Sequence, residues 1–371
     1  MTDTRAEEPD VSGADPVPSQ MLRALPVQLV ETSDGVVLKR GLSILKINGK
    51  GAAEVVSALL DFAQEPRTRE ELRSAFASRD HEAVDDLVEK LGQRRILVTW
   101  DGQLGEQLPA PDGLDIFYWN FGANPKLVAE QLGAARLTVL GINEVSQSLV
   151  GALAAGGVSD FTVVDYCLLR NVSFFDSAGA LRTARWGESP QAPVPYRTWA
   201  DEVQTDERRF VVATSDFGAT PAIRQWNRFC VGNGWGFLPV ILQDLIGYVG
   251  PLVIPGETAC YECLRARQNS HMTDPAAVRA PETRVFEDQR LAGFHPSMAR
   301  VVGELAAMEL LKFHSKLPMW RVGTMIEINL MAPSLTVRKV LKIPRCAVCS
   351  PTQLRAPVTL DTRVYNLTYS R

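Results

Sequence analysis

One stretch, residues 136–171, constrains the fold of this chain more than any other. It opens with an apolar run, Leu137–Leu140, that stops at Gly141. A segment with apolar residues at helical spacing follows, and then a second apolar run, Phe161–Val164, stops at Asp165. A strand, a glycine turn, a helix, a second strand and a terminal acid make the first βαβ unit of a nucleotide-binding sheet. The sequence therefore predicts an α/β domain that contains this unit.

The turn after the first strand lacks the residues that hold phosphate. A G-x-G-x-x-G loop that starts at Gly141 needs two more glycines, where this chain has Asn143 and Ser146. Glycine is required there because the backbone must approach the phosphates closely. Glu144 adds a negative charge at the helix N-terminus, where the dipole otherwise favours an anion. We therefore expect the nucleotide scaffold without a working nucleotide site.

Composition and charge narrow the class of protein. The chain has 371 residues, 46% of them apolar, which allows two or three globular domains. It has no apolar run of 18 residues, so the sequence predicts no membrane span. Residues 1–21 carry five acids and one arginine and are predicted to be a disordered tail. This tail accounts for the whole net charge of −4, so the balanced remainder gives no support to a general nucleic-acid or membrane-surface role.

Residues 22–100 predict a separate small domain. Three short alternating runs joined by tight turns indicate a strand meander, and they are Val27–Glu31, Val36–Arg40 and Ser43–Ile47. Three helices should follow, at 52–62, from the capping-box pattern at Thr68 to Phe76, and over about 82–93. Residues 96–98 add a further strand. This order predicts a winged helix-turn-helix module, whose meander has an edge that can accept an added peptide strand.

Residues 101–114, rich in Gly, Pro and polar groups, predict a linker to an α/β domain over residues 115–371. The strands expected after the βαβ unit are 210–213, 236–242, 246–254, 325–330 and 334–340. Helices are expected at 125–135, 221–230 and 298–313. On the last of these, the apolar side is predicted to follow Val301, Leu305, Met308 and Leu311.

Four of the six cysteines form two C-x-x-C pairs. The pairs are Cys260 with Cys263 and Cys346 with Cys349, separated by 82 residues. The first residues show no secretory signal, so a disulfide framework is not expected. Four thiolates at this spacing suit tetrahedral Zn²⁺ and leave no open position for water or substrate, which predicts a structural zinc site. The alternatives are a thioredoxin-like redox pair, without its usual strand-to-helix context, and two unrelated pairs of reduced thiols.

Several segments together resemble a known family. They are LTVLG…VVD, GPLVIPGETACYECL, the helix after GFHPSM, and IPRCAVCS. These segments are similar to the ThiF/MoeB or ubiquitin-activating-type fold with its zinc tetrathiolate. With an N-terminal winged helix they resemble the ocin-ThiF-like, or cyclodehydratase "C", leader-peptide-binding proteins of thiazole/oxazole-modified microcin pathways. Those pathways modify ribosomally made precursor peptides (RiPPs). The resemblance spans about residues 22–350.

The resemblance implies a non-catalytic scaffold in the cytoplasm, and the fold implies a homodimer. It makes Cys260, Cys263, Cys346 and Cys349 the zinc ligands. The residues that mark the degenerate nucleotide loop are Gly141, Asn143, Ser146 and Asp165. An ungapped count places Asp176 where adenylating relatives have an arginine, so no ATP is expected. A YcaO-type cyclodehydratase would phosphorylate the amide and close a Ser, Thr or Cys side chain into an azoline ring, while this chain holds the precursor.

The resemblance also implies where the leader peptide binds. In the RiPP recognition element, the leader is added as a strand beside the third strand and against the third helix. Here the strand residues are Leu42, Ser43, Ile44, Leu45, Lys46, Ile47 and Asn48. The floor of the groove would come from Val84, Leu87, Val88 and Leu91, for which packing in the domain core is the alternative.

Three other functions stay open. An active adenylating enzyme acting on a carboxylate or peptide terminus would need to bind nucleotide despite the degenerate loop. A nicotinamide-dependent enzyme that uses Asp165 on the ribose meets the same missing glycines. A DNA-binding regulator is disfavoured by the acids on the third helix, Glu82, Asp85, Asp86 and Glu89. The four histidines lie in no nucleophile motif, and His295 is expected to pack at a helix start.

Overall fold

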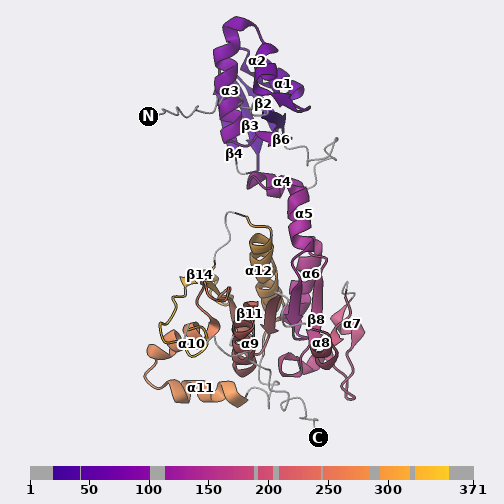
Figure 1. Cartoon of the computed structure of the whole chain (residues 1–371), viewed down its shortest axis with the longest axis vertical. Helices are drawn as coiled ribbons and strands as arrows, with labels where there is room; N and C mark the ends of the chain where they lie inside the picture. The colour runs from indigo at the N-terminus through magenta and orange to yellow at the C-terminus, as the bar shows by residue number, and fades with distance from the viewer. Residues whose placement is uncertain are drawn as a thin grey trace, which may run out of the picture. The chain divides into compact units, whose positions relative to one another are not determined.

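The computed structural model describes residues 20–41, 43–100, 113–187, 191–203, 209–243, 245–284, 293–317 and 322–350. The chain divides into two compact units, Met1–Leu127 and Val128–Arg371 (Figure 1). Residues 1–19 of the predicted tail and most of the predicted linker lie outside the described residues; the tail was predicted two residues too long, because Met21 begins a strand. No helix in the described part of the chain is long and apolar enough to cross a membrane.

The first unit contains the predicted meander. Strands β2 (Gln28–Thr32), β3 (Gly35–Arg40) and β4 (Ser43–Asn48) form an antiparallel sheet in the order β2-β3-β4. The turn between β3 and β4 requires Gly41, whose φ of 53° is left-handed. Leu42, the other residue of this turn, lies outside the described residues. Because no described strand pairs with its second edge, β4 is an edge strand.

A second small sheet in this unit was not predicted in full. Its order is β5-β1-β6, with β1 at Met21–Ala24, β5 at Arg67–Thr68 and β6 at Leu97–Trp100. Only β6 was expected from the sequence. β1 is four residues long and begins at the last residue of the predicted tail. Its stability comes from antiparallel pairing with β5 and β6, which are far along the chain. Local patterns carry no information about such pairing.

Three helices cover the sheets, as predicted. They are α1 (Ala52–Phe62), α2 (Arg69–Ser74) and α3 (His81–Gln93), and a 3₁₀ turn, η1 (Ser78–Asp80), precedes the third. The predicted capping box is confirmed, because Thr68 Oγ1 accepts a hydrogen bond of 3.2 Å from the N–H of Glu71. A further helix, α4 (Gly113–Asn120), belongs to the same unit. The winged-helix assignment itself stays a prediction.

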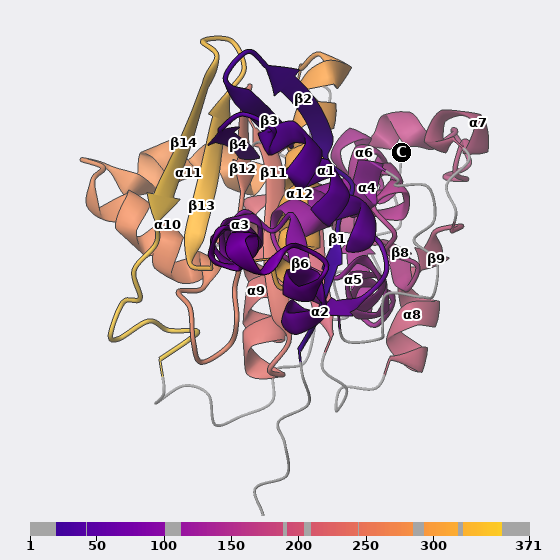
Figure 2. The same cartoon turned by 90° about the horizontal axis from the view of Figure 1, so that it is seen from above.

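The second unit is built on one eight-stranded sheet, in the order β14-β13-β12-β11-β10-β7-β8-β9. The parallel part consists of β7 (Leu137–Leu140), β8 (Phe161–Asp165), β9 (Val194–Pro195), β10 (Phe210–Ser215) and β11 (Gly236–Gln243). The antiparallel part adds β12 (Ile246–Val249), β13 (Thr324–Asn329) and β14 (Ser334–Lys339). Figure 2 shows β13 and β14 side by side as a hairpin. The predicted α/β class and closing strand pair are confirmed.

The strand order places a topological switch point between β7 and β10. From β7 the chain proceeds to β8 on one side, and β10 lies on the other. In open α/β sheets, ligands bind beyond the carboxyl ends of the strands at such a point. The boundary between the two units falls within α5 (Pro125–Gly133). The helices and 3₁₀ turns that follow it are α6 (Glu144–Ala155), η2 (Cys167–Leu169), η3 (Val172–Phe174), α7 (Thr183–Trp186), α8 (Tyr196–Glu202), α9 (Thr220–Gly232), α10 (Tyr261–Ser270), α11 (Pro275–Arg284) and α12 (Pro296–His314).

The predicted apolar face of α12 was wrong. The helix buries its small residues instead, together with a few large ones: Met298, Ala299, Val302, Gly303, Ala306, Ala307 and Leu310. Val301 and Met308, on the predicted face, are 44% and 42% exposed. α6 and α12 lie side by side (Figure 1), and a Cβ added at Gly303 would come within 2.7 Å of the Val145 carbonyl oxygen of α6. Small residues allow this close approach, whereas the prediction weighted only large apolar side chains.

Candidate functional site

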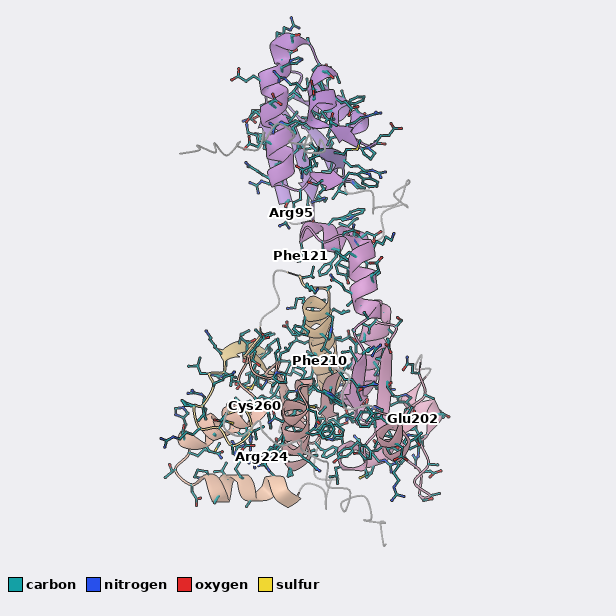
Figure 3. The ribbon with its side chains drawn as sticks, in the orientation of Figure 1. Arg95, Phe121, Glu202, Phe210, Arg224 and Cys260 are labelled. Atoms are coloured by element: carbon teal, nitrogen blue, oxygen red, sulfur yellow. The ribbon has the colours of Figure 1, made fainter. Side chains whose placement is uncertain are left out.

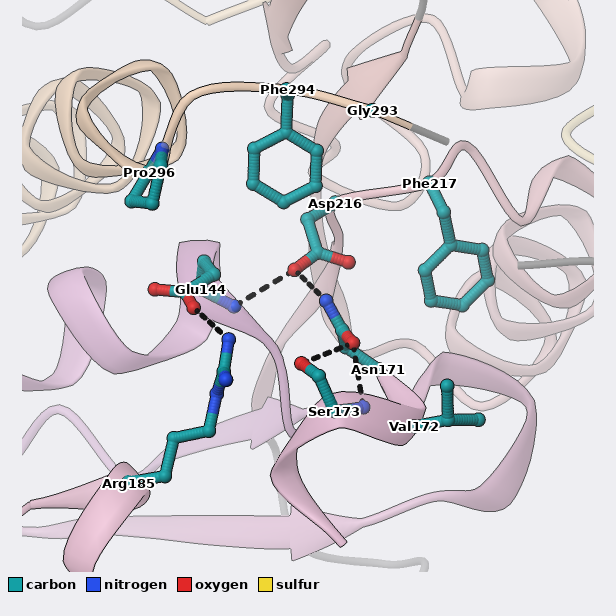
Figure 4. A pocket seen from close by; sticks show the side chains of 10 residues that line it. All are labelled: Glu144, Asn171, Val172, Ser173, Arg185, Asp216, Phe217, Gly293, Phe294 and Pro296. Atoms are coloured by element: carbon teal, nitrogen blue, oxygen red, sulfur yellow. Dashed lines mark hydrogen bonds and ion pairs between the residues drawn. The ribbon is translucent and has the colours of Figure 1, made fainter. Parts of the chain in front are cut away.

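A pocket of about 320 Å³ lies at the carboxyl ends of β7 and β10, at the switch point (Figure 4). Glu144, the first residue of α6, and Asp216, which directly follows β10, both line it. Asn171 and Ser173 reach it from the segment after β8. The residues before α12, including Phe294, close another side. The fold therefore assembles the pocket from segments that are far apart in the sequence.

The N-terminus of α6 is capped by the residues that replace the loop glycines. Asn143 Oδ1 accepts a hydrogen bond of 2.9 Å from the N–H of Ser146, and Ser146 Oγ accepts one of 3.0 Å from the N–H of Asn143. Asn143 Nδ2 donates to the carbonyl oxygens of Leu169 and Thr214, each at 3.1 Å. Both replacement residues are fully buried. They form a reciprocal capping box, which uses the backbone groups that would otherwise face a phosphate.

Gly141 is retained because its backbone needs it. Its φ is 105°, a conformation that other residues rarely adopt, and an added Cβ would meet Leu169 and the Thr214 carbonyl oxygen at 2.9 Å. The glycine therefore has a structural reason to be present whether or not a nucleotide binds.

Asp216 is the most unusual group in the pocket. Its Oδ2 accepts hydrogen bonds from the N–H of Glu144 at 3.0 Å and from Asn171 Nδ2 at 2.8 Å. The residue is 2% exposed, and Oδ1 has no hydrogen-bond partner. Burial raises the pKa of this carboxyl to about 6, against the hydrogen bonds from Asn171 and Glu144, which lower it. A buried carboxylate with one unsatisfied oxygen is costly in its charged form, which is why the pKa of this group rises.

Two arginines near the pocket are paired. Arg185 Nη2 lies 3.0 Å from Glu144 Oε1, and its guanidinium stacks 4.9 Å above the ring of Phe174. Arg170 pairs with Asp165 through two hydrogen bonds, of 2.5 and 2.6 Å. Asp165, the acid that would bind a ribose, is therefore already engaged by this arginine.

Asp176 does not line the pocket. Its Oδ1 accepts hydrogen bonds from the N–H groups of Ala178 and Ala180, at 2.9 and 2.8 Å, so the side chain closes its own turn. The cation that lines the pocket is Arg185. Sequence reasoning also missed Asn171 and Asp216. Asp216 had a usable signal, because it follows an apolar strand just as Asp165 does.

The four cysteines of the C-x-x-C pairs come together as predicted. Their sulfur atoms all lie within 4.8 Å of one another, and all four residues are buried. The Sγ separations are 3.9 Å for Cys260–Cys263, 3.7 Å for Cys260–Cys346 and 3.4 Å for Cys263–Cys349. Zn–S bonds of about 2.3 Å in a tetrahedron give sulfur separations of about 3.8 Å. The donor set therefore fits a zinc ion with four thiolate ligands.

The surroundings of this cluster fix its position. Cys260 caps α10 and Cys263 lies in its first turn, while the N–H of Ile343 donates to Cys263 Sγ at 3.4 Å. Arg224 of α9 pairs with Glu262 through hydrogen bonds of 2.9 and 2.5 Å, and Figure 3 shows Arg224 and Cys260 in the same part of the unit. Because Arg267 also donates to the carbonyl oxygen of Leu341 at 2.8 Å, α10 and the segment after β14 are joined at several points.

The described residues of the predicted peptide strand form β4. Along this strand, the N–H and C=O groups of successive residues point alternately towards β3 and towards the open edge. Gly49 N–H donates to the Asp34 carbonyl oxygen at 3.0 Å, next to the pair Gly35–Asn48. Bonded and non-bonded pairs alternate in an antiparallel ladder, so Ser43, Leu45 and Ile47 bond to β3. The residues whose N–H and C=O groups point to the open edge are Ile44, Lys46 and Asn48, and their side chains are exposed.

The four α3 residues predicted as a groove floor are in the domain core. Val84, Leu87, Val88 and Leu91 are at most 7% exposed and belong to one cluster with residues of β3, α1 and α2. Leu45 and Ile47 of β4 pack against the same cluster. The alternative of core packing therefore describes these four side chains, and the accessible part of the predicted site is β4.

Comparisons with known proteins show the fold. No family model and no curated protein sequence matches the chain. A crystal structure of E. coli MccB matches with a TM-score of 0.65 at 16% identity, over 91% of this chain and 99% of that chain. The microcin C7 biosynthetic enzyme MccB in complex with N-formylated MccA matches with a TM-score of 0.62 at 16% identity, over 89% and 100%. The heterocyclase TruD matches with a TM-score of 0.58 at 19% identity, over 89% of this chain but 43% of TruD.

Proposed function

We propose that this protein is a leader-peptide-binding scaffold. It would bind a ribosomally made precursor peptide and present it to a YcaO-type cyclodehydratase, which forms the azoline or azole rings. The observation that carries this proposal is a contrast between two places in the chain: the edge strand β4 and the N-terminus of α6. The edge strand β4 is open for a peptide, whereas the helix terminus that would hold a phosphate is closed by the chain's own Asn143 and Asp216.

Peptide binding is supported by the solved relatives. MccB has been solved in complex with MccA, and that likeness covers nearly the whole of both chains. TruD, which shares the fold, is a heterocyclase. In the proposed complex, the leader adds a strand to β4, whose outward N–H and C=O groups at Ile44, Lys46 and Asn48 supply affinity with little demand on sequence. The exposed side chain of Ile44, at 57%, would contribute to specificity.

The absence of nucleotide chemistry is part of the proposal. A phosphate at the start of α6 would have to displace the Asn143–Ser146 capping box and lie against the carboxylates of Glu144 and Asp216. We infer that this protein binds no ATP and that the partner enzyme supplies it. The four-cysteine cluster holds a structural zinc ion in the same proposal, and the protein acts in the cytoplasm as a homodimer.

The proposal is tested by calorimetric titration of the full chain with its leader peptide and, separately, with ATP–Mg²⁺. We expect leader binding without nucleotide binding. Lys46→Pro removes an N–H that faces the open edge and should reduce leader affinity at least tenfold. Lys46→Ala is the matched control: it also loses the Lys46–Asp34 ion pair of 2.7 Å but keeps the N–H, so its affinity should stay within about twofold. Equal binding by wild type and Lys46→Pro would contradict strand addition to β4.

A second candidate function is an ATP-dependent adenylating enzyme acting on a peptide or carboxylate. It is favoured by one observation: MccB, described as a biosynthetic enzyme and solved with ATP, has the same fold. A pocket also persists at the switch point. ATP–pyrophosphate exchange in the presence of candidate peptides would identify this activity. Exchange that depends on the peptide would replace the scaffold proposal with an enzymatic one.

A further inference from the structure

One end of the first unit brings two arginines close together. Arg40, the last residue of β3, is 4% exposed, and its Nε and Nη1 are buried without a hydrogen-bond partner. Arg95 lies two residues after the end of α3 and is exposed to solvent; Figure 3 labels it at this end of the unit. Burial lowers the pKa of Arg40, and the nearby positive charge of Arg95 lowers it further. Two like charges therefore lie together, and one of them is out of water.

No acid among the described residues of this unit pairs with either arginine. Arg95 Nη1 donates a hydrogen bond of 3.0 Å to the carbonyl oxygen of Asn120, a neutral group at the end of α4, and Nε and Nη2 bond to no described residue. The acids in the ion pairs of the described unit face other cations, and they are Asp34, Glu65, Asp80, Asp85 and Asp86. The charge at this end is therefore not neutralised by the described part of the unit, which favours binding of an anionic group.

These arginines lie beside the first residues of β4. Arg40 pairs with Ser43 in the ladder between β3 and β4, and the next residue, Ile44, is the first whose N–H and C=O point to the open edge. The turn between the two strands touches α4, because a Cβ added at Gly41 would lie 2.3 Å from Asn120 Nδ2. Asn120 is also the residue that accepts the hydrogen bond from Arg95. The exposed guanidinium therefore lies near the Ser43 end of the strand at which the leader is proposed to bind.

We propose that the leader peptide carries an acidic side chain whose carboxylate binds Arg95 where the leader passes the Ser43 end of β4. This inference rests on the proposed function and adds to it the charge of the peptide that the site selects. Arg95 Nε and Nη2 offer two parallel N–H groups, the arrangement that binds a carboxylate through two hydrogen bonds. Because its Nε and Nη1 are buried, Arg40 acts through its charge and not through contact with the ligand.

A carboxylate on the leader fits this place better than a free anion does. A free anion would gain only a contact with an exposed guanidinium, and such contacts contribute little in water. A carboxylate on a paired strand is held next to Arg95 by the backbone hydrogen bonds to β4, which raise its effective concentration. A lysine or arginine at the same position of the leader would be repelled. The site should therefore prefer an acidic residue to a neutral one, and a neutral residue to a basic one.

The first experiment selects binders to the full chain from a displayed library of random twelve-residue peptides at low salt. We expect the enriched peptides to share an Asp or Glu at one fixed distance from an alternating apolar segment, and to lose binding to Lys46→Pro. Selection on Arg95→Gln should enrich the apolar segment without the acid, whereas Arg95→Lys keeps the charge and should retain the preference. Peptides that need the N–H of Lys46 but carry no preferred acid would overturn this inference and leave the scaffold proposal intact. Enriched peptides that bind Lys46→Pro as tightly as wild type would contradict strand addition itself, as would a selection that enriches no peptide.

Calorimetric titration of one selected peptide and its Asn or Gln counterpart then measures the contact. Removal of the carboxylate should weaken binding to wild type about fivefold at 50 mM NaCl and less than about twofold at 500 mM. In Arg95→Gln, shown to be folded by urea unfolding, the two peptides should bind equally. Arg79→Gln is the matched control: Arg79 is also exposed, at 87%, but it precedes α3, so this variant should keep the fivefold difference. An equal loss of affinity in wild type and Arg95→Gln would show that the acid binds elsewhere and would overturn the assignment.

Discussion

The backbone N–H of Glu144 donates a hydrogen bond of 3.0 Å to Asp216 Oδ2, so a carboxylate from one strand end closes the first turn of the helix that follows the neighbouring strand. The N-terminus of this helix, a kind of position that commonly binds anions, is therefore already bonded to a carboxylate of the chain itself. The contact also leaves the second oxygen of Asp216 buried without a partner. The same residue therefore affects both helix capping and stability, which makes it an informative position for mutation.

Replacing Asp216 with Asn should stabilise the protein at neutral pH. A folded-state pKa of about 6, above the ordinary 3.8, means that the carboxyl contributes stability fully below pH 3.8 and loses it as the pH rises through 6. Two pKa units correspond to about 3 kcal/mol, an upper bound here. We expect Asp216→Asn to raise the free energy of unfolding at pH 7.5 by about 1–3 kcal/mol and to leave it little changed at pH 4. Urea unfolding of wild type and variant at the two pH values measures both differences in the free energy of unfolding.

Replacing His314 should change the pH dependence of the free energy of unfolding in the opposite direction. Burial among Phe210 and Phe313 lowers the pKa of this histidine to about 4, and its Nε2 has no partner. The unfolded chain takes up the proton near pH 6.5, so the folded state loses stability as the pH falls from 6.5 towards 4. In the wild-type protein this loss of stability amounts to about 3 kcal/mol, and His314→Phe should remove most of it. The exposed His271→Gln is the control, and an equal change in that variant would contradict the assignment.

The pH responses of Asp216 and His314 oppose each other between about pH 4 and 6.5. In the wild-type protein they partly cancel, so a flat stability profile would hide both. Each response should become visible only when the other residue is replaced, and the double variant should show neither.

Restoring glycine in the loop should not restore nucleotide binding. Asn143→Gly removes a helix cap and the buried hydrogen bonds to the carbonyl oxygens of Leu169 and Thr214, so we expect a loss of about 2–3 kcal/mol. Asn143→Ser keeps a capping oxygen and should lose less. ATP–Mg²⁺ titration should stay negative in both variants, because the carboxylate of Asp216 still accepts from the helix N-terminus. ATP binding by Asn143→Gly would show that the capping box alone excludes the nucleotide.

Removal of metal should destabilise the second unit. If Cys260, Cys263, Cys346 and Cys349 hold zinc, mercurial titration of the thiols should release one Zn²⁺ per chain, detected with a colorimetric indicator. Cys263→Ser should lower the zinc content and the thermal midpoint together, because the cluster joins α10 to the segment after β14. Cys167→Ser, at a half-buried cysteine outside the cluster, should alter neither. Full stability of metal-free protein would contradict a structural ion.

Local patterns in the sequence predicted much of this architecture. The βαβ unit, the meander and the cysteine pairs each consist of neighbouring residues with fixed spacing, so their signals are complete within a short window. β1 was missed because only pairing with the distant β6 makes it a strand. Arg185 was missed as a pocket residue for the same reason: the fold of the chain brings it beside Glu144, and no spacing in the sequence indicates this.

The groove prediction shows another limit of sequence patterns. Val84 and Leu91 have the spacing of a buried helix face, and spacing alone does not distinguish a face that contacts a peptide from one that contacts the core. In the structure both residues pack in the core, since neither is more than 1% exposed. The direction of each N–H in β4 likewise required the register with β3, which the hydrogen bond from Gly49 to Asp34 fixes.

The close packing of α6 on α12 leads to a last prediction, at Gly303. A Cβ there would lie 2.7 Å from the Val145 carbonyl oxygen, 2.8 Å from Ser148 Cβ and 2.9 Å from the Leu149 nitrogen, all on α6. Backbone atoms cannot move aside without separating the helices, so Gly303→Ala should cost about 1–3 kcal/mol despite the better helix propensity of alanine. Gly151→Ala is the matched control: this glycine is also helical, but nothing lies within 4 Å of its added Cβ, so a gain of about 0.5–1 kcal/mol is expected. Chemical unfolding of both variants gives the two signs directly, and a Gly303→Ala protein as stable as wild type would show that the two helices do not pack this closely in solution.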